Sequence, residues 1–260
     1  MQISYRFRQI FWSIYFVLTI GLVGSLFGYV FTFALYFAAF LLSPWKGPSD
    51  RIRHGGEFFQ CASIRFLLRL QPWLRAETNL PELRGFYDNF GTRRVLFVGN
   101  HRSNLDTFLL ISYVPGLRGL AKSSLFYNIF FAPFMWVAGF IPVKKGSPES
   151  FMEGLKMLRT KLLERERPVL IFPENTRCKK GASSLEKFSA AVFSMAIDAE
   201  ALIVPLAIVG TDDVLGKGEF WLSPGHPIRI KMLPPVRASD YTDAQALRDR
   251  VREALKVELP

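Results

Sequence analysis

Residues 95–106 read VLFVGNHRSNLD, and their order of apolar and polar residues indicates the fold class. Its first five residues form a short apolar run, which is typical of a strand buried on both faces. The apolar run that follows at residues 107–112 indicates a helix. His101 therefore leaves a strand and Asp106 enters a helix, which is the alternation expected of an α/β domain.

The rest of the chain repeats this alternation. Further strands are predicted at residues 119–122, 140–143, 169–172, 202–208 and 228–232, and helices at residues 149–165, 185–199 and 243–257. We predict an α/β fold with a mostly parallel central sheet flanked by helices, preceded by an N-terminal hydrophobic helical hairpin. In such a fold the site lies in the loops beyond the carboxyl ends of the strands.

The N-terminal segment carries no charged side chain between residues 9 and 45. As a single helix it would extend to about 55 Å, whereas the hydrocarbon core of a bilayer is about 30 Å thick. Two helices that meet near Gly21, Gly24 or Gly28 fit better than one tilted span. A cleaved signal peptide is disfavoured because its apolar region is typically only about 7 to 15 residues long. Basic residues on both flanks predict that both ends lie on the cytoplasmic side.

Residues 58–75 form an amphipathic segment in which Arg65 and Arg69 lie four residues apart. Such a helix can lie among lipid headgroups or can pack on the protein core, and the sequence favours neither. The predicted organisation is a membrane-anchoring hairpin (residues 1–54), an amphipathic interfacial helix and linker (55–84), and an α/β domain (85–260).

The chain has a formal net charge of +11 and a pI near 9.8, so anionic partners are expected. Basic residues are scattered among apolar ones and no nucleic-acid-binding motif occurs, which favours membrane lipids and phosphorylated substrates over nucleic acid. The two cysteines, Cys61 and Cys178, form no paired motif, so neither a disulfide framework nor a thiolate metal site is predicted. Cys178 is interpreted as a packing residue.

The first chemical motif is NHRSNLD at residues 100–106. A turn between the strand and the helix can bring the Asp106 carboxylate onto the His101 imidazole. A carboxylate on one ring nitrogen fixes the tautomer and raises the basicity of the other nitrogen, which suits removal of a proton from an alcohol. The alternative is a helix-capping aspartate beside a loop histidine.

The second motif is FPENTR at residues 172–177, again directly after an apolar strand. Arg177 offers a planar fork that matches a phosphate, Thr176 a hydroxyl, and Glu174 an acceptor for a hydroxyl or a loop amide. Together they suit a phosphorylated polyol. The alternative is a surface turn with a local ion pair between Glu174 and Arg177.

Taken together, the two motifs resemble the signature blocks of the glycerophospholipid acyltransferase superfamily, and in particular its bacterial lysophosphatidate acyltransferase branch. GFIPVKKG at residues 139–146 and IVPLAI at residues 203–208 resemble two further blocks in the same order. The resemblance covers roughly residues 85–255. It implies a membrane-associated enzyme at the cytoplasmic face of the inner membrane that acylates the sn-2 hydroxyl of lysophosphatidate.

The resemblance also implies a role for each motif residue. His101 would be the catalytic base and Asp106 its orienting partner, with Asn100 in the same loop. Arg177 and Lys145 would bind the acceptor phosphate, and Lys122 would flank the pocket. Glu174 and Thr176 would hold the glycerol or organise the loop. The acyl donor would be a thioester, acyl-CoA or acyl carrier protein, as co-substrate, with no other cofactor, no metal and no covalent acyl-enzyme.

The sequence departs from the family pattern at three places. Asn175 stands where the family usually has glycine, so the turn needs a left-handed residue other than glycine. Lys145 replaces a common arginine, and residues 187–196 lack a usual lysine and glycine. The alternatives are acylation of another lysolipid, such as lyso-ornithine lipid or another lysophospholipid, a metal-dependent phosphoesterase, and a non-catalytic membrane lipid-binding protein.

Overall fold

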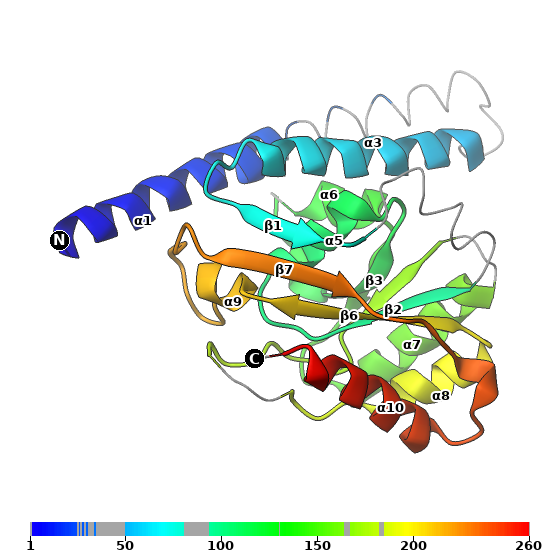
Figure 1. Cartoon of the computed structure of the whole chain (residues 1–260). Coiled ribbons are helices and arrows are strands. Elements are labelled where there is room, and N and C mark those ends of the chain that lie inside the picture. The colour runs from blue at the N-terminus through cyan, green and yellow to red at the C-terminus, as the bar shows by residue number, and fades with distance from the viewer. Residues whose placement is uncertain are drawn as a thin grey trace.

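The computed structural model describes residues 2–24, 26, 28, 30, 34, 50–80, 94–129, 131–163, 167–181 and 185–259. A central sheet organises the described part of the chain, with helices on both of its faces (Figure 1). The strands are β1 (Arg75–Thr78), β2 (Val95–Gly99), β3 (Arg118–Lys122), β4 (Ile141–Val143), β5 (Val169–Ile171), β6 (Leu202–Val209), β7 (Pro227–Met232) and β8 (Val236–Arg237). The helices are α1 (Gln2–Phe16), η1 (Val17–Val23), α3 (Asp50–Arg69), α5 (Leu105–Tyr113), η2 (Ser123–Tyr127), α6 (Ala132–Val137), α7 (Pro148–Leu163), α8 (Ala190–Asp198), α9 (Thr211–Val214), η3 (Ala238–Asp240) and α10 (Ala244–Val257).

The strand order of the sheet is β1-β7-β6-β2-β5-β3-β4, and the short β8 pairs with β6. All neighbours along this path are parallel except β6 and β7. The strands β6, β2, β5, β3 and β4 therefore end at the same edge of the sheet. The loops that follow them are the ones expected to form a site.

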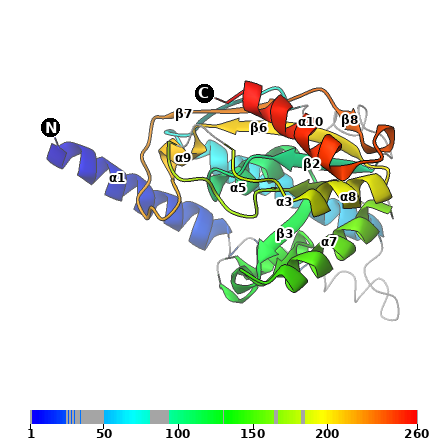
Figure 2. The ribbon, with the colours of Figure 1, turned by 90° about the horizontal axis from the view of Figure 1, so that it is seen from below.

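Each face of the sheet carries its own apolar core. Along β2, Val95 and Phe97 pack into one core, and Leu96 and Val98 into the other, as the alternation of side chains along a strand requires. The first core is covered by α3 and α5, and the second by α7, α8 and α10 (Figures 1 and 2). This burial on both faces explains why β2 is apolar throughout.

The fold class and the six predicted strands are confirmed, whereas the bounds of two predicted helices were wrong and two strands, β1 and β8, were not predicted. The helix predicted over residues 58–75 ends at Arg69. β1, which the sequence did not predict, follows it as a polar edge strand beside β7. The helix predicted from residue 185 begins at Ala190, because the backbone N–H groups of Glu186 and Ser189 donate to Glu174 and Pro173 instead of continuing a helix.

The N-terminal helix runs through α1 and a π-helical stretch, η1, and α1 projects past the sheet in both views (Figures 1 and 2). The chain is still helical at Gly21, Gly24 and Gly28, the three glycines near which a turn was predicted. Most of the second leg of the predicted hairpin lies outside the described residues. Within the described residues, no helix is long and apolar enough to cross a bilayer.

Helix α3 packs on the protein core, which is one of the two alternatives that the sequence left open. Cys61, Ile64 and Leu68 are buried on it. Arg65 donates from Nε to the carbonyl of Ser112, 3.0 Å away, and its guanidinium lies over the Tyr113 ring. The helix crosses the domain boundary predicted at residue 54, and β1, within the predicted linker, joins the sheet.

Candidate active site

His101 and Asp106 meet directly after β2, as the sequence predicted. The His101 Nδ1 atom lies 2.8 Å from Oδ2 of Asp106. The histidine side chain keeps 20% of its surface exposed, whereas the aspartate side chain has 0% exposed. The His101 ring also stacks on the ring of Phe172, with 4.1 Å between the ring centroids. The carboxylate and the aromatic ring together fix the plane of the imidazole and leave Nε2 as the atom for chemistry.

The buried carboxylate of Asp106 is held by backbone groups of the same turn. Its Oδ2 atom accepts from the backbone N–H groups of Arg102 and Ser103, both at 2.8 Å, in addition to the contact with His101. Its Oδ1 atom is buried and has no hydrogen-bond partner among the described residues. Three donors on one oxygen keep the charge at the histidine side of the carboxylate.

Asn100 fastens this turn to the neighbouring strand. Its Nδ2 atom donates to the carbonyl of Ile208 and its Oδ1 atom accepts from the N–H of Ile208, both at 2.8 Å. The Asn100 amide therefore hydrogen-bonds to β6 in the way that the backbone of a neighbouring strand residue would. The predicted supporting role of Asn100 corresponds to a fully buried amide that positions His101 next to it.

Glu174 joins the second motif to the first, and both of its carboxylate oxygens bind donors of this chain. Oε1 accepts from the backbone N–H of His101 at 2.9 Å, and Oε2 accepts from the N–H of Glu186 at 2.8 Å and from Sγ of Cys178 at 3.0 Å. The N–H of Cys178 in turn donates to the carbonyl of His101. Of the two roles that the resemblance offered for Glu174, this geometry matches organisation of the loop.

The side chain of Arg177 is half-buried, and its guanidinium makes no hydrogen bond or ion pair with the residues that the structure describes. The local Glu174–Arg177 ion pair that the sequence left open is not formed. Thr176 is exposed and its Oγ1 accepts from Nζ of Lys217 at 2.9 Å, so Lys217 competes with any ligand for this hydroxyl. Asn175 has φ 55°, the left-handed conformation that its place in the motif predicted.

Lys122 and Lys145 lie at the same edge of the sheet as His101, but at increasing distance from it. Lys122 ends β3 and Lys145 follows β4, and both side chains are exposed. In the strand order β2-β5-β3-β4, these ends lie two and three strands from β2. Strands lie about 4.8 Å apart, so the ends of β3 and β4 are about 10 and 15 Å from that of β2.

A third loop, after β6, contacts both motifs and was missed by the sequence reasoning. Arg102 and Asp212 form a buried ion pair at 3.4 Å, and Asp212 also accepts from the N–H of Gly181 at 3.3 Å. The hydroxyl of Ser103 donates to the carbonyl of Leu215 at 2.6 Å. These partners lie more than a hundred residues after the first motif, so no local spacing could have indicated them.

The cysteines are not placed as nucleophiles. Both are buried, and burial raises the pKa of Cys61 and of Cys178 to about 12. At Cys178 the hydrogen bond to the Glu174 carboxylate raises the pKa further in the same direction. The prediction of a packing role for Cys178 agrees with its burial. No group of three or more His, Cys, Asp or Glu side chains in the described part of the chain could hold a metal ion.

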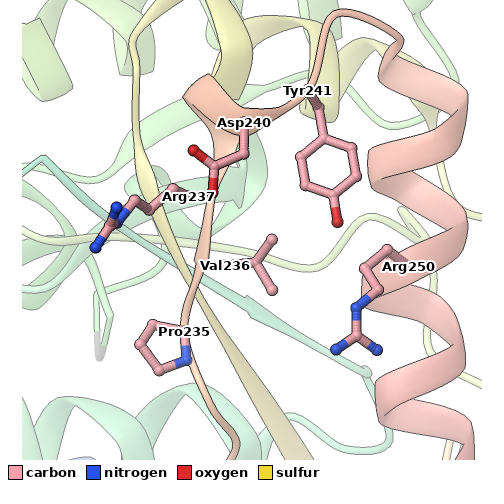
Figure 3. A pocket seen from close by; sticks show the side chains of 6 residues that line it. All are labelled: Pro235, Val236, Arg237, Asp240, Tyr241 and Arg250. Carbon is pink, nitrogen blue, oxygen red and sulfur yellow. The ribbon is translucent and has the colours of Figure 1, made fainter.

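An open depression on the far side of the sheet does not belong to this site. It is lined by residues of β8, η3, α10 and the chain next to them, among them Arg237, Tyr241 and Arg250 (Figure 3). β8 pairs with the first residues of β6. The depression therefore lies at the edge of the sheet opposite to His101.

Comparison with known proteins supports the fold and identifies the family. Residues 74–209 match the family model described as Acyltransferase. The crystal structure of the 1-acyl-sn-glycerophosphate acyltransferase PlsC from Thermotoga maritima has a TM-score of 0.72 at 18% identity, and the likeness covers 98% of this chain and 95% of that one.

Sequence relatives carry similar names. The chain is 28% identical over 204 residues to 1-acyl-sn-glycerol-3-phosphate acyltransferase from Limnanthes alba, covering 78% of this chain and 67% of that protein. It is 29% identical over 177 residues to the alpha form from Homo sapiens, covering 67% and 62%. With the Limnanthes douglasii protein the match spans 58% of this chain and about half of that protein, 53%. The matched family region contains both motifs and the β6 strand that supports them, so the chain belongs to the acyltransferase family.

Proposed function

We propose that this protein transfers a fatty acyl group from an acyl thioester to the sn-2 hydroxyl of lysophosphatidate and so forms phosphatidate. The observation that carries the proposal is the His101–Asp106 pair, beside a loop whose Arg177 guanidinium has no partner among the described residues. The family membership and the names of the relatives support the same reaction. The acyl donor would be acyl-CoA or acyl carrier protein, and the site would work at the cytoplasmic face of a membrane.

In the proposed reaction His101 acts as a general base. With Nδ1 facing the Asp106 carboxylate, Nε2 accepts the proton of the acceptor hydroxyl while its oxygen attacks the thioester carbonyl carbon. Asp106 stabilises the imidazolium that forms, and the imidazolium returns the proton to the departing thiolate. The products are the ester and the free thiol.

The contacts of the hydroxyl and thiol groups support direct transfer without an acyl-enzyme. Ser103 lies close to His101, but its hydroxyl donates to the carbonyl of Leu215 at 2.6 Å. Cys178 is buried with a pKa raised to about 12, mainly by desolvation. A nucleophile needs a base that activates it or a lowered pKa. The Ser103 hydroxyl donates to a backbone carbonyl, and the Glu174 carboxylate beside Cys178 raises the pKa of that thiol instead of lowering it.

For the acceptor we assign the phosphate to Arg177, because a free guanidinium fork matches two phosphate oxygens. Lys122 and Lys145 would add positive charge along the same sheet edge. We assign Glu174 and Thr176 to the loop instead, because Glu174 binds the backbone of His101 and Thr176 binds Lys217. Acceptor recognition then depends on Arg177 and the lysines.

The decisive experiment supplies purified protein with acyl-CoA and acyl carrier protein thioesters in parallel, and with a panel of acceptors. Lysophosphatidate, lysophosphatidylcholine and lyso-ornithine lipid are compared, and the lipid product is identified by mass spectrometry. His101→Ala is expected to abolish product formation. Arg177→Ala is expected to raise KM for lysophosphatidate more than it lowers kcat, because it removes binding of a group remote from the reacting atoms.

Three results would contradict the proposal. Near-normal turnover by a folded His101→Ala variant would rule out His101 as the general base. A preference for lyso-ornithine lipid, which has no phosphate, would contradict the assignment of Arg177 to the acceptor phosphate and would identify a different acceptor. Absence of any acyl product with every donor and acceptor would favour the non-catalytic alternative.

A further inference from the structure

Two large aromatic side chains stand exposed on the connection between β6 and β7. Phe220 keeps 90% of its surface exposed and Trp221 keeps 51%. Soluble surfaces rarely present neighbouring aromatic residues without a partner, because each one leaves a large apolar area in water. We call residues 211–223, which carry this pair, the 211–223 segment.

The 211–223 segment is hydrogen-bonded to the N-terminal helix. The backbone N–H of Leu222 donates to Oγ of Ser13 at 2.8 Å, and Nε2 of Gln9 donates to Oγ of Ser223 at 3.0 Å. Figures 1 and 2 both show the loop before β7 lying against α1. The aromatic pair is therefore held beside α1.

The helix surface next to this contact is apolar as well. Ile10 and Ile14 directly follow Gln9 and Ser13, so at helical spacing they form the adjoining row on α1, and both are exposed. Phe7 and Phe11 extend the exposed apolar surface, and the side chains of Arg6 and Arg8 at the start of the helix are also exposed. Apolar side chains flanked by arginines are complementary to a bilayer surface with anionic headgroups.

The same segment also contacts the candidate active site. Nζ of Lys217 donates to the carbonyl of Arg177 at 2.8 Å, and Lys180 and Glu219 form an ion pair at 2.9 Å. The hydroxyl of Ser103 donates to Leu215 within it. One short segment thus connects the apolar helix surface, the loop of Arg177 and the turn of His101.

We propose that Phe220 and Trp221 insert into the headgroup layer of an anionic bilayer beside α1, and that this contact sets the site at the depth where the acceptor headgroup lies. The consequence for catalysis rests on the function proposed above, whereas the bilayer contact does not. Trp suits this position because its ring is apolar and its N–H can bond to headgroups. The acceptor phosphate could then reach Arg177 without its acyl chain leaving the bilayer.

The bilayer contact is tested with a fluorophore at position 220. Full-length Phe220→Cys is labelled with nitrobenzoxadiazole and reconstituted into vesicles of phosphatidylethanolamine and phosphatidylglycerol. Labelling is selective because Cys61 and Cys178 are buried and the pKa of each is raised to about 12. The matched control is Glu253→Cys on the exposed face of α10. We expect the label at 220 to be quenched by doxyl-lipids and shielded from aqueous iodide, and the label at 253 to show the reverse.

A kinetic measurement tests the consequence. Phe220→Ser/Trp221→Ser is expected to raise KM for acceptor presented in vesicles about tenfold. For a short-chain acceptor dissolved as monomers, kcat/KM should change by less than about twofold, because the site itself is unaltered. Met157→Ser, which removes an exposed apolar side chain from α7, is the control and should change neither value.

Several outcomes overturn the inference. If the label at 220 responds to iodide as the label at 253 does, the segment does not enter the bilayer. If lipid leaves the label exposed but added acyl carrier protein shields it, the surface binds the donor protein instead. Equal losses with vesicle and monomeric acceptor would mean that the segment acts only through the active site. If wild-type protein makes no acyl product, the proposed function fails while the quenching result still decides the bilayer contact.

Discussion

Replacement of Asp106 by asparagine tests the geometry of the His101–Asp106 pair more sharply than replacement by alanine does. In the structure a single oxygen, Oδ2, receives all three hydrogen bonds, from His101 and from two backbone N–H groups. The other oxygen has no partner among the described residues. An asparagine must therefore place its carbonyl at the Oδ2 position, because its NH₂ group cannot face two backbone donors. The His101 tautomer is kept and only the charge is lost.

The expected fall in kcat of Asp106→Asn follows from the change in one hydrogen bond, the one between residue 106 and His101. A hydrogen bond to a charged group contributes about 1.5 to 3 kcal/mol, against about 0.5 to 1.5 kcal/mol for a neutral one. The imidazolium that forms in the transition state thus loses about 1 to 2 kcal/mol of stabilisation, which corresponds to a fall in kcat of about 5- to 30-fold. Asp106→Ala also frees the tautomer and leaves buried donors unpaired, so we expect a fall of about 10³-fold.

The assay is release of free thiol from the acyl thioester at saturating lysophosphatidate. Circular dichroism and thermal unfolding verify that each variant is folded, since the buried NH₂ group without an acceptor should cost about 1 to 3 kcal/mol of stability. If folded Asp106→Asn is as inactive as His101→Ala, the carbonyl does not take the Oδ2 position and the hydrogen-bond assignment is wrong. If it turns over at the wild-type rate, Asp106 does not stabilise the imidazolium.

Three further predictions concern the supports of the site. Asn175→Gly should leave the melting temperature nearly unchanged, whereas Asn175→Val should cost about 1 to 2 kcal/mol, because φ there is 55°; equal melting temperatures of the two variants would argue against a left-handed turn. Asp212→Ala should lower the free energy of unfolding by about 3 kcal/mol, because it breaks a buried ion pair with Arg102, while Asp213→Ala on the same helix should have little effect in the same denaturant titration. Both cysteines should resist iodoacetamide at pH 8 in the folded protein and react after unfolding, because burial raises the pKa of each thiol to about 12; alkylation without unfolding, seen by mass spectrometry, would contradict this.

Much of the fold could be predicted because its strands are buried on both faces. Runs such as VLFVG and VLI are apolar throughout and stand out from their surroundings, so six of the eight described strands and their mostly parallel arrangement could be predicted. The strand RAET, β1, could not be predicted in this way. It lies at the edge of the sheet, and its side chains are at least partly exposed.

In the candidate site, too, some contacts could be predicted from the sequence and others could not. His101 and Asp106 could be predicted to meet because five residues and one turn separate them. The left-handed Asn175 followed from the motif in which it stands. The contacts of Lys217 with Thr176 and of Asp212 with Arg102 could not be predicted, because each joins residues far apart in the chain. The sequence also left two roles open for Glu174, and only the structure shows that both of its carboxylate oxygens accept hydrogen bonds from the backbone N–H groups of His101 and Glu186.

The buried and exposed residues of the site differ in how freely they can be substituted, which bears on how the preference for an acceptor could change. Asn100, Asp106 and Glu174 are buried and each bonds backbone atoms of the segments that form the site, so substitutions there would disturb folding as well as chemistry. Lys122 and Lys145 are exposed near strand ends, and among the described residues no such bond restrains their side chains. Selection or engineering could therefore exchange these lysines to suit a different headgroup while the reacting centre stays intact.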